Sequence, residues 1–321
     1  MSKKFNNKYL IIIFGVLILL FIFVKFYRSV KTERTLKTDI VEVDTAKVDK
    51  ILLYPSSEKG QELTFIREGN SWTVSNGKIK TETEKNDVTN LLSQLLQIKS
   101  KRLVSRSKDK WEEYQLTDTS ATRIKVFEGG KEKTDLLIGK FTYQQTRDPY
   151  GRSGITGTSY VRLTSEDEVY ANDGFLSFTF NQSFNNWRNQ SLISLNKADI
   201  TRLTFRYPGD SSFVVSFTDK KWMLGNLQAD SVKVVNFLNT ITNKKASTFD
   251  DTFTPVGNSQ YQLTIEGNNM SNITIDAFSA NGDAFKINSS MNTKSWFSSD
   301  AKGLFKDIFK SKKEFIPSGK K

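Results

Sequence analysis

Two stretches of the sequence start alike: AKVDKILLYP at residues 46–55 and ADITRLTFRYP at residues 198–208. Each alternates apolar with polar side chains before it reaches Tyr-Pro, and such alternation is typical of a β-strand with one buried face. Ile51 and Leu203 occupy the same place in the two stretches. The match predicts an internal duplication in which each copy opens with a strand.

Further matches follow in the same order along both copies. Trp72 corresponds to Trp222 in the next strand-like run. The apolar positions of the following segment also correspond, namely Leu91, Leu92 and Leu95 in the first copy and Val234, Val235 and Leu238 in the second. The separation between matched residues falls along the chain, from 152 at Ile51 and Leu203 to 124 at the last match, as expected if the loops are shorter in the second copy. We interpret these residues as equivalent structural positions.

The pattern within each copy predicts the fold class. Short alternating runs divided by turn-forming residues indicate antiparallel strands, and residues 87–99 and 230–242 have the apolar spacing of one amphipathic helix per copy. We expect an α+β protein in which an N-terminal transmembrane helix is followed by two tandem repeats, each a curved antiparallel sheet with a packed helix. The expected segments are a cytoplasmic leader at 1–8, an anchor at 9–27, a tether at 28–43, a first repeat at 44–190, and a second repeat with a basic C-terminal tail at 191–321.

The anchor is predicted from YLIIIFGVLILLFIFV, residues 9–24, which contain no charge. Extended to Tyr27, this stretch approaches the ~30 Å thickness of a bilayer's hydrocarbon core. Tyr9 and Tyr27 then stand where interfacial aromatic side chains are found. A cleaved signal peptide is the alternative, but no small-residue cleavage site follows. Counting flanking Lys and Arg favours a cytoplasmic body, whereas the family resemblance described below favours an extracytoplasmic one, which we expect.

Composition and charge exclude several classes of function. The chain has no Cys and no His, which rules out disulfides, thiol nucleophiles and any catalytic or metal site that depends on a histidine. The net charge of +12 is concentrated in residues 1–50 and 302–321, each with +5, so the body is almost neutral. Basic ends on a neutral body fit contact with a lipid bilayer better than a nucleic-acid groove, and no nucleic-acid partner is expected.

Three sequence features resemble functional sites and are better explained by structure. Gly151, Gly154 and Gly157 are followed by a strand instead of a helix, so they indicate a hairpin loop and not a phosphate-binding loop. Adjacent acids such as those at 250–251 lack the spacing of a calcium loop or a paired-carboxylate enzyme. Trp72 and Trp222 recur in matching strands, which favours a core role over sugar binding. We therefore expect no catalytic residue, cofactor or metal.

Several motifs in a fixed order resemble one bacterial family. After the two opening strands and the Trp-containing strand come LLSQLLQIKSKRLVS at 91–105, YQLTD at 114–118, LLIGK at 136–140, YVRL at 160–163 and EVYANDGFLSFTFNQSFNNWRNQSLISL at 168–195. In these motifs the chain resembles the family called domain of unknown function 4340, over nearly all of residues 44–290 and including the anchor. The segment RDPYGRSGITGTS at 147–159 is a departure, since a shorter loop is expected there.

The resemblance implies a location and a class of partner but no activity. Similar proteins look like inner-membrane subunits with the bulk of the chain on the periplasmic side, often encoded beside ABC-type export components that resemble those of gliding-motility systems. We expect a non-enzymatic, membrane-anchored extracytoplasmic scaffold or accessory subunit whose partner is an ABC-type permease or ATPase complex. The alternative is an extracytoplasmic binding module for cell-wall glycan or an exported substrate.

Overall fold

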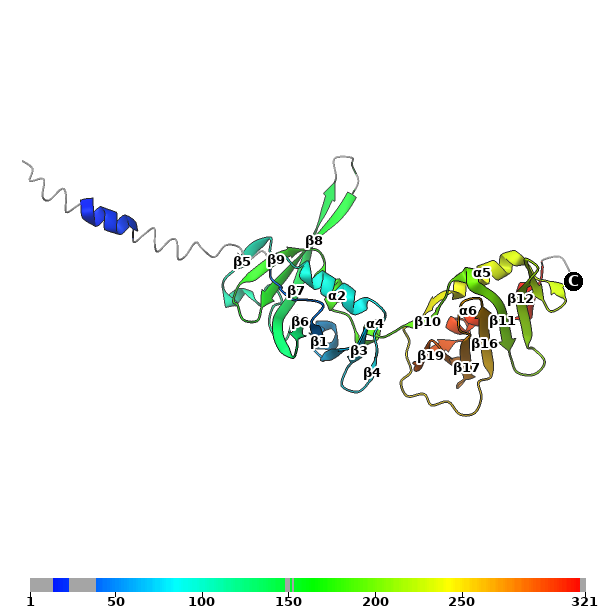
Figure 1. Ribbon diagram of the computed structural model, residues 1–321. Helices are drawn as coiled ribbons and strands as arrows, with labels where there is room; N and C mark the ends of the chain where they lie inside the picture. Colours follow the sequence, from blue (N-terminus) through cyan, green and yellow to red (C-terminus); the bar gives the residue numbers. More distant parts are fainter. Residues whose placement is uncertain (1–13, 23–38, 148–150, 152, 318–321) are drawn as a thin grey trace, which may run out of the picture.

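The opening strand of the first half lies in the middle of a nine-stranded antiparallel sheet (Figure 1). The computed structural model describes residues 14–22, 39–147, 151 and 153–317. The strand order in this sheet is β4-β3-β2-β1-β6-β7-β8-β9-β5. Its elements are β1 (Val48–Tyr54), β2 (Leu63–Glu68), β3 (Ser71–Ser75), β4 (Lys80–Glu82), α2 (Asp87–Leu96), β5 (Arg102–Ser105), β6 (Thr122–Glu128), β7 (Lys131–Arg147), β8 (Ser153–Leu163) and β9 (Val169–Asp173).

Helix α2 covers one face of this sheet because its apolar residues repeat at helical spacing. Val88, Leu91, Leu92 and Leu95 are all buried in the core that α2 forms with the inward side chains of the strands. The chain leaves β4 at one edge, crosses the sheet as α2, and returns as β5 at the opposite edge. The opposite face of the sheet, which we call the outer face, is not covered by α2.

Two short helices, α3 (Leu176–Phe180) and α4 (Phe184–Trp187), connect the halves. The second half has an eight-stranded antiparallel sheet of order β14-β13-β12-β11-β16-β17-β18-β19 and a separate β10-β15 pair. Its elements are β10 (Ser191–Ser194), β11 (Ile200–Arg206), β12 (Phe213–Thr218), β13 (Lys221–Leu224), β14 (Leu227–Gln228), α5 (Ser231–Ile241), β15 (Asn243–Lys245), β16 (Tyr261–Gly267), β17 (Ile273–Ser279), β18 (Ala284–Ser289), β19 (Asn292–Asp300) and α6 (Leu304–Ile308). Four short 3-10 helices complete the described fold, at Ser56–Glu58, Lys108–Lys110, Lys197–Asp199 and Lys312–Phe315.

The two halves follow the same path until the strand after the helix. Strands β1 to β4 and β6 to β9 of the first half occupy the positions of β11 to β14 and β16 to β19 in the second. The difference is that β5 joins its sheet beside β9, whereas β15 pairs with β10. A single bridge in the first half resembles the β10-β15 pair, because Asp39, before the sheet, pairs with Lys99, after the helix. The neighbouring Ile40 and Val41 are buried in the core. Packed structure thus begins by residue 39, inside the range expected to be a tether.

The expected α+β class with an N-terminal transmembrane helix is wrong. Antiparallel sheets dominate the described residues, and each half contributes only one helix of 10 or 11 residues to them. Near the N-terminus a helix is described over residues 14–22, with exposed apolar side chains. Tyr9, Tyr27 and the rest of the expected anchor lie outside the described residues. In the part of the chain that is described, no helix has the length and apolar character needed to cross a membrane.

The C-terminal tail closes the core of the second half. Phe309 and Phe315 are buried, and the ring of Phe315 lies 5.7 Å from that of Phe205 on β11. The backbone N–H of Asp230 donates to the carbonyl of Phe315 at 2.9 Å, which joins the tail to the start of α5. The side chain of Asp230 caps α5 by accepting from Val232 and Lys233. The residues expected to be a basic tail therefore include part of the hydrophobic core.

Candidate functional site

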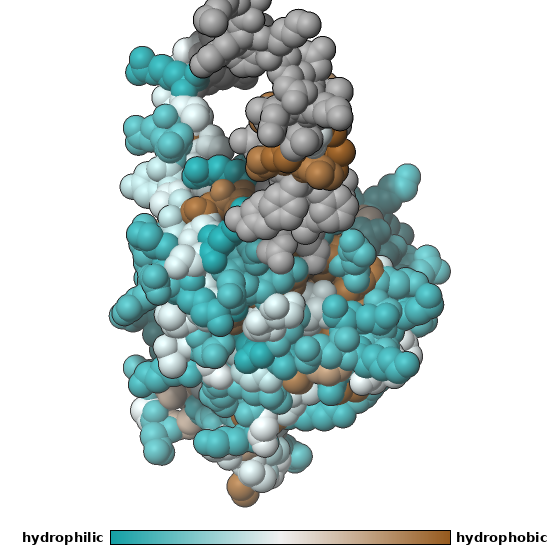
Figure 2. Space-filling model, turned by 90° about the vertical axis from the view of Figure 1, so that its left-hand side faces the viewer, coloured by the Kyte–Doolittle hydropathy of each residue, from teal (hydrophilic) through white to brown (hydrophobic). Residues whose placement is uncertain are grey.

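A network of charged side chains lies on the outer face of the first sheet. On β6, Ile124 and Val126 point into the core, so the alternation of the strand sends Arg123 and Lys125 to the outer face. On the adjacent β7, Asp135 is only 10% exposed and faces Lys125 across the ladder. The described residues of the surface that faces the viewer in Figure 2 are mostly hydrophilic.

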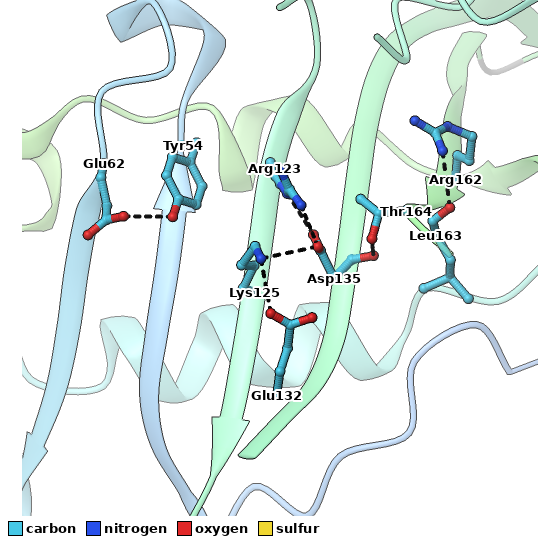
Figure 3. Close-up of polar contacts among 9 residues, drawn as sticks. All are labelled: Tyr54, Glu62, Arg123, Lys125, Glu132, Asp135, Arg162, Leu163 and Thr164. Atoms are coloured by element: carbon cyan, nitrogen blue, oxygen red, sulfur yellow. Dashed lines mark hydrogen bonds and ion pairs between the residues drawn. The ribbon is translucent and has the colours of Figure 1, made fainter. Parts of the chain in front are cut away.

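The geometry of this charged network, which consists of Arg123, Lys125, Glu132 and Asp135, is shown in Figure 3. Arg123 donates to both carboxylate oxygens of Asp135, from Nε at 2.8 Å and from Nη2 at 2.5 Å. Lys125 Nζ lies 3.3 Å from Asp135 Oδ2 and donates to Glu132 Oε2 at 3.0 Å. A two-point contact of this kind fixes the orientation of the guanidinium as well as its charge. The network is therefore an ordered patch of both signs.

The environment of the network keeps Asp135 and Lys125 ionised. Burial alone would raise the pKa of Asp135, but the hydrogen bonds from Arg123 and the charges of Arg123 and Lys125 outweigh it, so the pKa lies below its usual value. The hydrogen bond to Glu132 raises the pKa of Lys125. Nearby, burial and the 2.6 Å hydrogen bond to Glu62 raise the pKa of Tyr54 well above its ordinary value. None of these groups is placed to gain or lose a proton near neutral pH.

At three aligned positions the second half carries neutral residues where the first carries members of this network. Ile51 of β1 faces Val126, and Leu203 of β11 faces Ile265, so the two ladders can be aligned residue by residue. The alignment places Gln262 at the position of Arg123, Thr264 at that of Lys125 and Thr274 at that of Asp135. Since the same strand order forms without these charges, the network is not a requirement of the fold. This makes it the best candidate for a functional surface.

A buried arginine lies on the same sheet. Arg162 of β8 is 3% exposed, and its guanidinium lies 3.5 Å from the centre of the Trp111 ring. It donates to the carbonyls of Leu116 and Glu166 at 3.2 Å. Burial lowers the pKa of Arg162 from its ordinary value, although the group stays cationic because arginine starts so high. Arg162 thus fastens the loop around Trp111 to the outer face.

A second arginine joins the two halves. Arg188, directly after α4, is 1% exposed and donates to both oxygens of Asp251, at 2.8 and 2.6 Å. Its guanidinium also lies 3.7 Å from the centre of the Phe249 ring. Two exposed ion pairs cross the same boundary, Lys245 with Glu84 at 3.2 Å and Lys294 with Glu82 at 3.5 Å. Arg188 contributes most to fixing the joint, because its guanidinium is buried, whereas pairs formed by exposed lysines contribute little.

A pocket of about 440 Å³ lies at this joint. It is lined by residues of both halves, among them Arg67, Trp72, Glu84, Asn189 and Met291. Trp72 is half-buried there, whereas its counterpart Trp222 is only 7% exposed. The two matched tryptophans therefore differ, because Trp222 belongs entirely to a core, whereas Trp72 also lines the pocket.

The remaining predicted positions lie in the two cores, with one exception. Ile51, Leu91, Leu92 and Leu95 are buried in the first half, and Leu203, Val234 and Leu238 in the second. Val235 is 38% exposed, and Phe237, which the sequence matching passed over, is buried instead. The apolar stripe of α5 is turned relative to that of α2. Gly154 and Gly157 lie on β8, in a hairpin with β7.

The charged network and Arg188 were not singled out from the sequence. The run Arg123-Ile124-Lys125-Val126 carries a usable signal, because its alternation assigns both cations to one face. Pairing them with Asp135 requires the register of β6 and β7, which is interrupted by a bulge at Val126 and Phe127. Among the residues that the structure describes, no group of three or more acidic side chains is arranged to hold a metal ion.

Comparison with known proteins identifies the family. The model of the family described as "Domain of unknown function (DUF4340)" matches residues 74–264. The chain belongs to this family. The resemblance seen in the sequence motifs is thereby confirmed, and the DUF4340 match runs from β3 to β16, across the charged network and the joint. Neither a curated protein nor a solved structure matches the chain.

Proposed function

We propose that this DUF4340 protein is a non-enzymatic extracytoplasmic accessory subunit that docks onto a component of an ABC-type export system at the inner membrane. The observation that carries the proposal is the charged network on the outer face of the first sheet. It is ordered by the two-point contact of Arg123 with Asp135, it is partly exposed, and the second half has the neutral Gln262, Thr264 and Thr274 at the positions of Arg123, Lys125 and Asp135.

The chemistry of the network fits docking better than catalysis. Its carboxylate is already held by two cations, and the chain contains no His or Cys to act as base or nucleophile near neutral pH. A patch with both signs of charge selects a partner with the complementary pattern and speeds its approach. The basic ends of the chain, each with +5, add attraction to an anionic membrane surface.

Exchange of the network for the residues of the second half tests the proposal. Arg123→Gln, Lys125→Thr and Asp135→Thr together remove three of the four charges of the network and install side chains that the same topology tolerates at Gln262, Thr264 and Thr274. After mild detergent extraction of the full chain, we expect the native protein to co-purify with a permease or ATPase and the triple variant to lose that partner.

A matched control uses the Arg202 and Glu266 pair of the second sheet, which is an exposed ion pair at 3.1 Å. Arg202→Gln with Glu266→Gln should leave co-purification unchanged. Retention of the transporter component by the triple variant, or its absence from the native preparation, would exclude this docking surface. Reporter fusions at the C-terminus test the location, and a cytoplasmic signal would contradict it.

A second candidate function rests on Trp72. An aromatic ring that faces a pocket lined by Arg67, Glu84 and Asn189 offers both a stacking surface and hydrogen-bonding groups for a sugar. If the protein is instead a glycan-binding module, purified cell wall should retain the native chain, and Trp72→Ala should abolish retention. Conservative Trp72→Phe should preserve part of it, which separates stacking from a loss of folding.

A further inference from the structure

Strands β7 and β8 continue well beyond the rest of the first sheet as a two-stranded arm (Figure 1). Their pairing extends from Phe141 opposite Ser159 to Arg147 opposite Ser153. The neighbouring strands end at the base of this region, since β6 begins opposite Ile138 and β9 ends opposite Thr158. Among the described residues, no strand pairs with either outer edge of the arm past these points.

The backbone groups that face the open edge of β7 follow from one hydrogen bond. The carbonyl of Gly157 accepts from the N–H of Gly174 at 2.9 Å, so the backbone groups of Gly157 point away from β7. Its cross-strand partner Tyr143 therefore points its own N–H and C=O to the opposite side, the open edge of β7. By alternation, Phe141 and Gln145 do the same. This edge offers a row of unpaired donors and acceptors.

The arm lacks the usual protection of an exposed edge. Natural edges are blunted by lysine, proline or a bulge, but the stretch Phe141 to Thr146 contains no charge and no proline, and its pairing with β8 is regular. Its apolar side chains are not packed either, because Tyr143 and Ile155 are each 64% exposed. An isolated two-stranded hairpin is only marginally stable in water. The arm has the properties of an interaction element that lacks its partner.

We propose that this partner is a second copy of the same arm, joined edge to edge through β7 in an antiparallel four-stranded sheet. A two-fold axis beside Gln144 places Gln144 opposite its own copy, Tyr143 opposite Gln145, and Phe141 opposite Arg147. When two identical edges pair, charged side chains near the axis meet like charges and repel. In the overlap of residues 141–147 the only charged residue is Arg147, which lies opposite Phe141 of the other copy, so the cation meets an aromatic ring. The edge is therefore complementary to itself.

The same symmetry joins the exposed apolar side chains. A two-fold axis perpendicular to the sheet leaves the same face of both arms on one side, so Tyr143 and Ile155 of each copy share a continuous surface. At its base lies an aromatic group in which the rings of Phe141 and Phe178 are 5.3 Å apart, with Phe178 63% exposed. Pairing removes part of this surface from water, which favours the dimer.

Disulfide trapping tests the proposed register, and the absence of native cysteine makes it specific. Gln144 forms a hydrogen-bonded pair with Thr156 inside the arm, so its backbone groups point away from the new edge. Gln144 and its copy therefore form a non-hydrogen-bonded pair across that edge, with Cα atoms about 4.5 Å apart. That distance is within the range for a disulfide. Under mild oxidation, full-length Gln144→Cys should form a covalent dimer on non-reducing gels.

Thr156→Cys is the matched control, because Thr156 lies opposite Gln144 in the arm, is equally exposed, and faces the other edge. It should remain monomeric. Adding Gln145→Pro to Gln144→Cys removes an outward donor and should abolish the dimer, whereas Ile155→Pro, which removes the matching donor from β8, should leave it. No dimer with Gln144→Cys, or equal dimer with Thr156→Cys, would overturn the proposal. The proposed docking function does not depend on the result.

Discussion

The two halves of the molecule share a strand order but not a surface. The first sheet carries Arg123, Lys125 and Asp135 on its outer face, and the second carries Gln262, Thr264 and Thr274 at the same ladder positions. The first projects a long arm where β17 and β18 end in a short turn. The comparison shows that the shared strand order is what the fold requires, whereas the charged network and the arm are features of the first half alone.

The largest effect is expected from Phe315→Ala. This ring is 1% exposed in the core of the second half, while the first half completes its core without a C-terminal segment. Loss of a buried phenylalanine costs about 3–5 kcal/mol. Chemical denaturation should show the second half unfolding at a lower denaturant concentration than in the native chain. Phe217→Ala, at a ring that is 43% exposed in the same half, is the control and should cost far less.

The joint between the halves is tested by Asp251→Ala. The variant leaves the buried guanidinium of Arg188 without its carboxylate partner, and loss of these charge-assisted hydrogen bonds costs about 1.5–3 kcal/mol. We expect the two halves to unfold in separate transitions and the chain to be cut near 187–191 in limited proteolysis. Asp210→Ala, in an exposed turn, should change neither property. A single cooperative transition in both variants would contradict a joint that depends on this pair.

A smaller effect is expected from Asp135→Thr, which leaves Arg123 and Lys125 without their shared carboxylate. We expect a loss of about 1–2 kcal/mol at neutral pH, while the triple exchange that also neutralises both cations recovers most of it. The folded pKa of Asp135 is lowered, so its stabilisation is present above the unfolded value near 3.9 and disappears as pH falls through the lower folded value. Denaturation of native and variant chains should therefore converge in acid.

The control for this pH dependence is Asp250, whose pKa the hydrogen bond from Lys286 lowers to about 2. In Asp135→Thr the contribution of Asp250 is retained, so some loss of stability must remain between pH 4 and pH 2. If the difference in the free energy of unfolding between the native chain and Asp135→Thr stays constant at all pH values, the contribution of Asp135 does not depend on its protonation, which contradicts the lowered pKa.

The smallest effect is expected at the helix position where the halves diverge. Val235→Ala on α5 should change stability by no more than about 0.5 kcal/mol, because the side chain is 38% exposed. The matched Leu92→Ala on α2 removes a side chain that is 4% exposed and should cost about 2–5 kcal/mol. Thermal or chemical denaturation of the two variants measures the difference. Equal costs would mean that the helices pack in the same orientation.

Positions that depend on local periodicity, such as the buried face of a helix, could be predicted from the sequence. Contacts that depend on the register of paired strands or on the rotation of a helix could not. Leu91, Leu95 and Leu238 were found because helical spacing alone assigns them to a buried face. Val235 was taken as equivalent to Leu92 by position, but a turn of the α5 stripe brings Phe237 to the core instead.

The charged network shows the limit of local patterns more clearly. Arg123 and Asp135 meet only because β6 and β7 pair in one register around a bulge, and no pattern within either strand reveals it. The arm was expected to be a loop from residue 147 onward, since Gly154 and Gly157 are weak strand formers. Gly157 leaves room for the ring of Phe175, since an added Cβ would lie 2.7 Å from it.

The burial of Phe315 has a consequence for how the chain matures. Synthesis proceeds from the N-terminus and domains fold as they emerge, so the first half has all of its core residues long before the second. The second half receives the Phe315 side chain only after its sheet and α5 have been synthesised. A chain that stops before residue 315 lacks the ring that packs against Phe205, Phe213 and Phe237, so the aromatic core of its second half stays open to water.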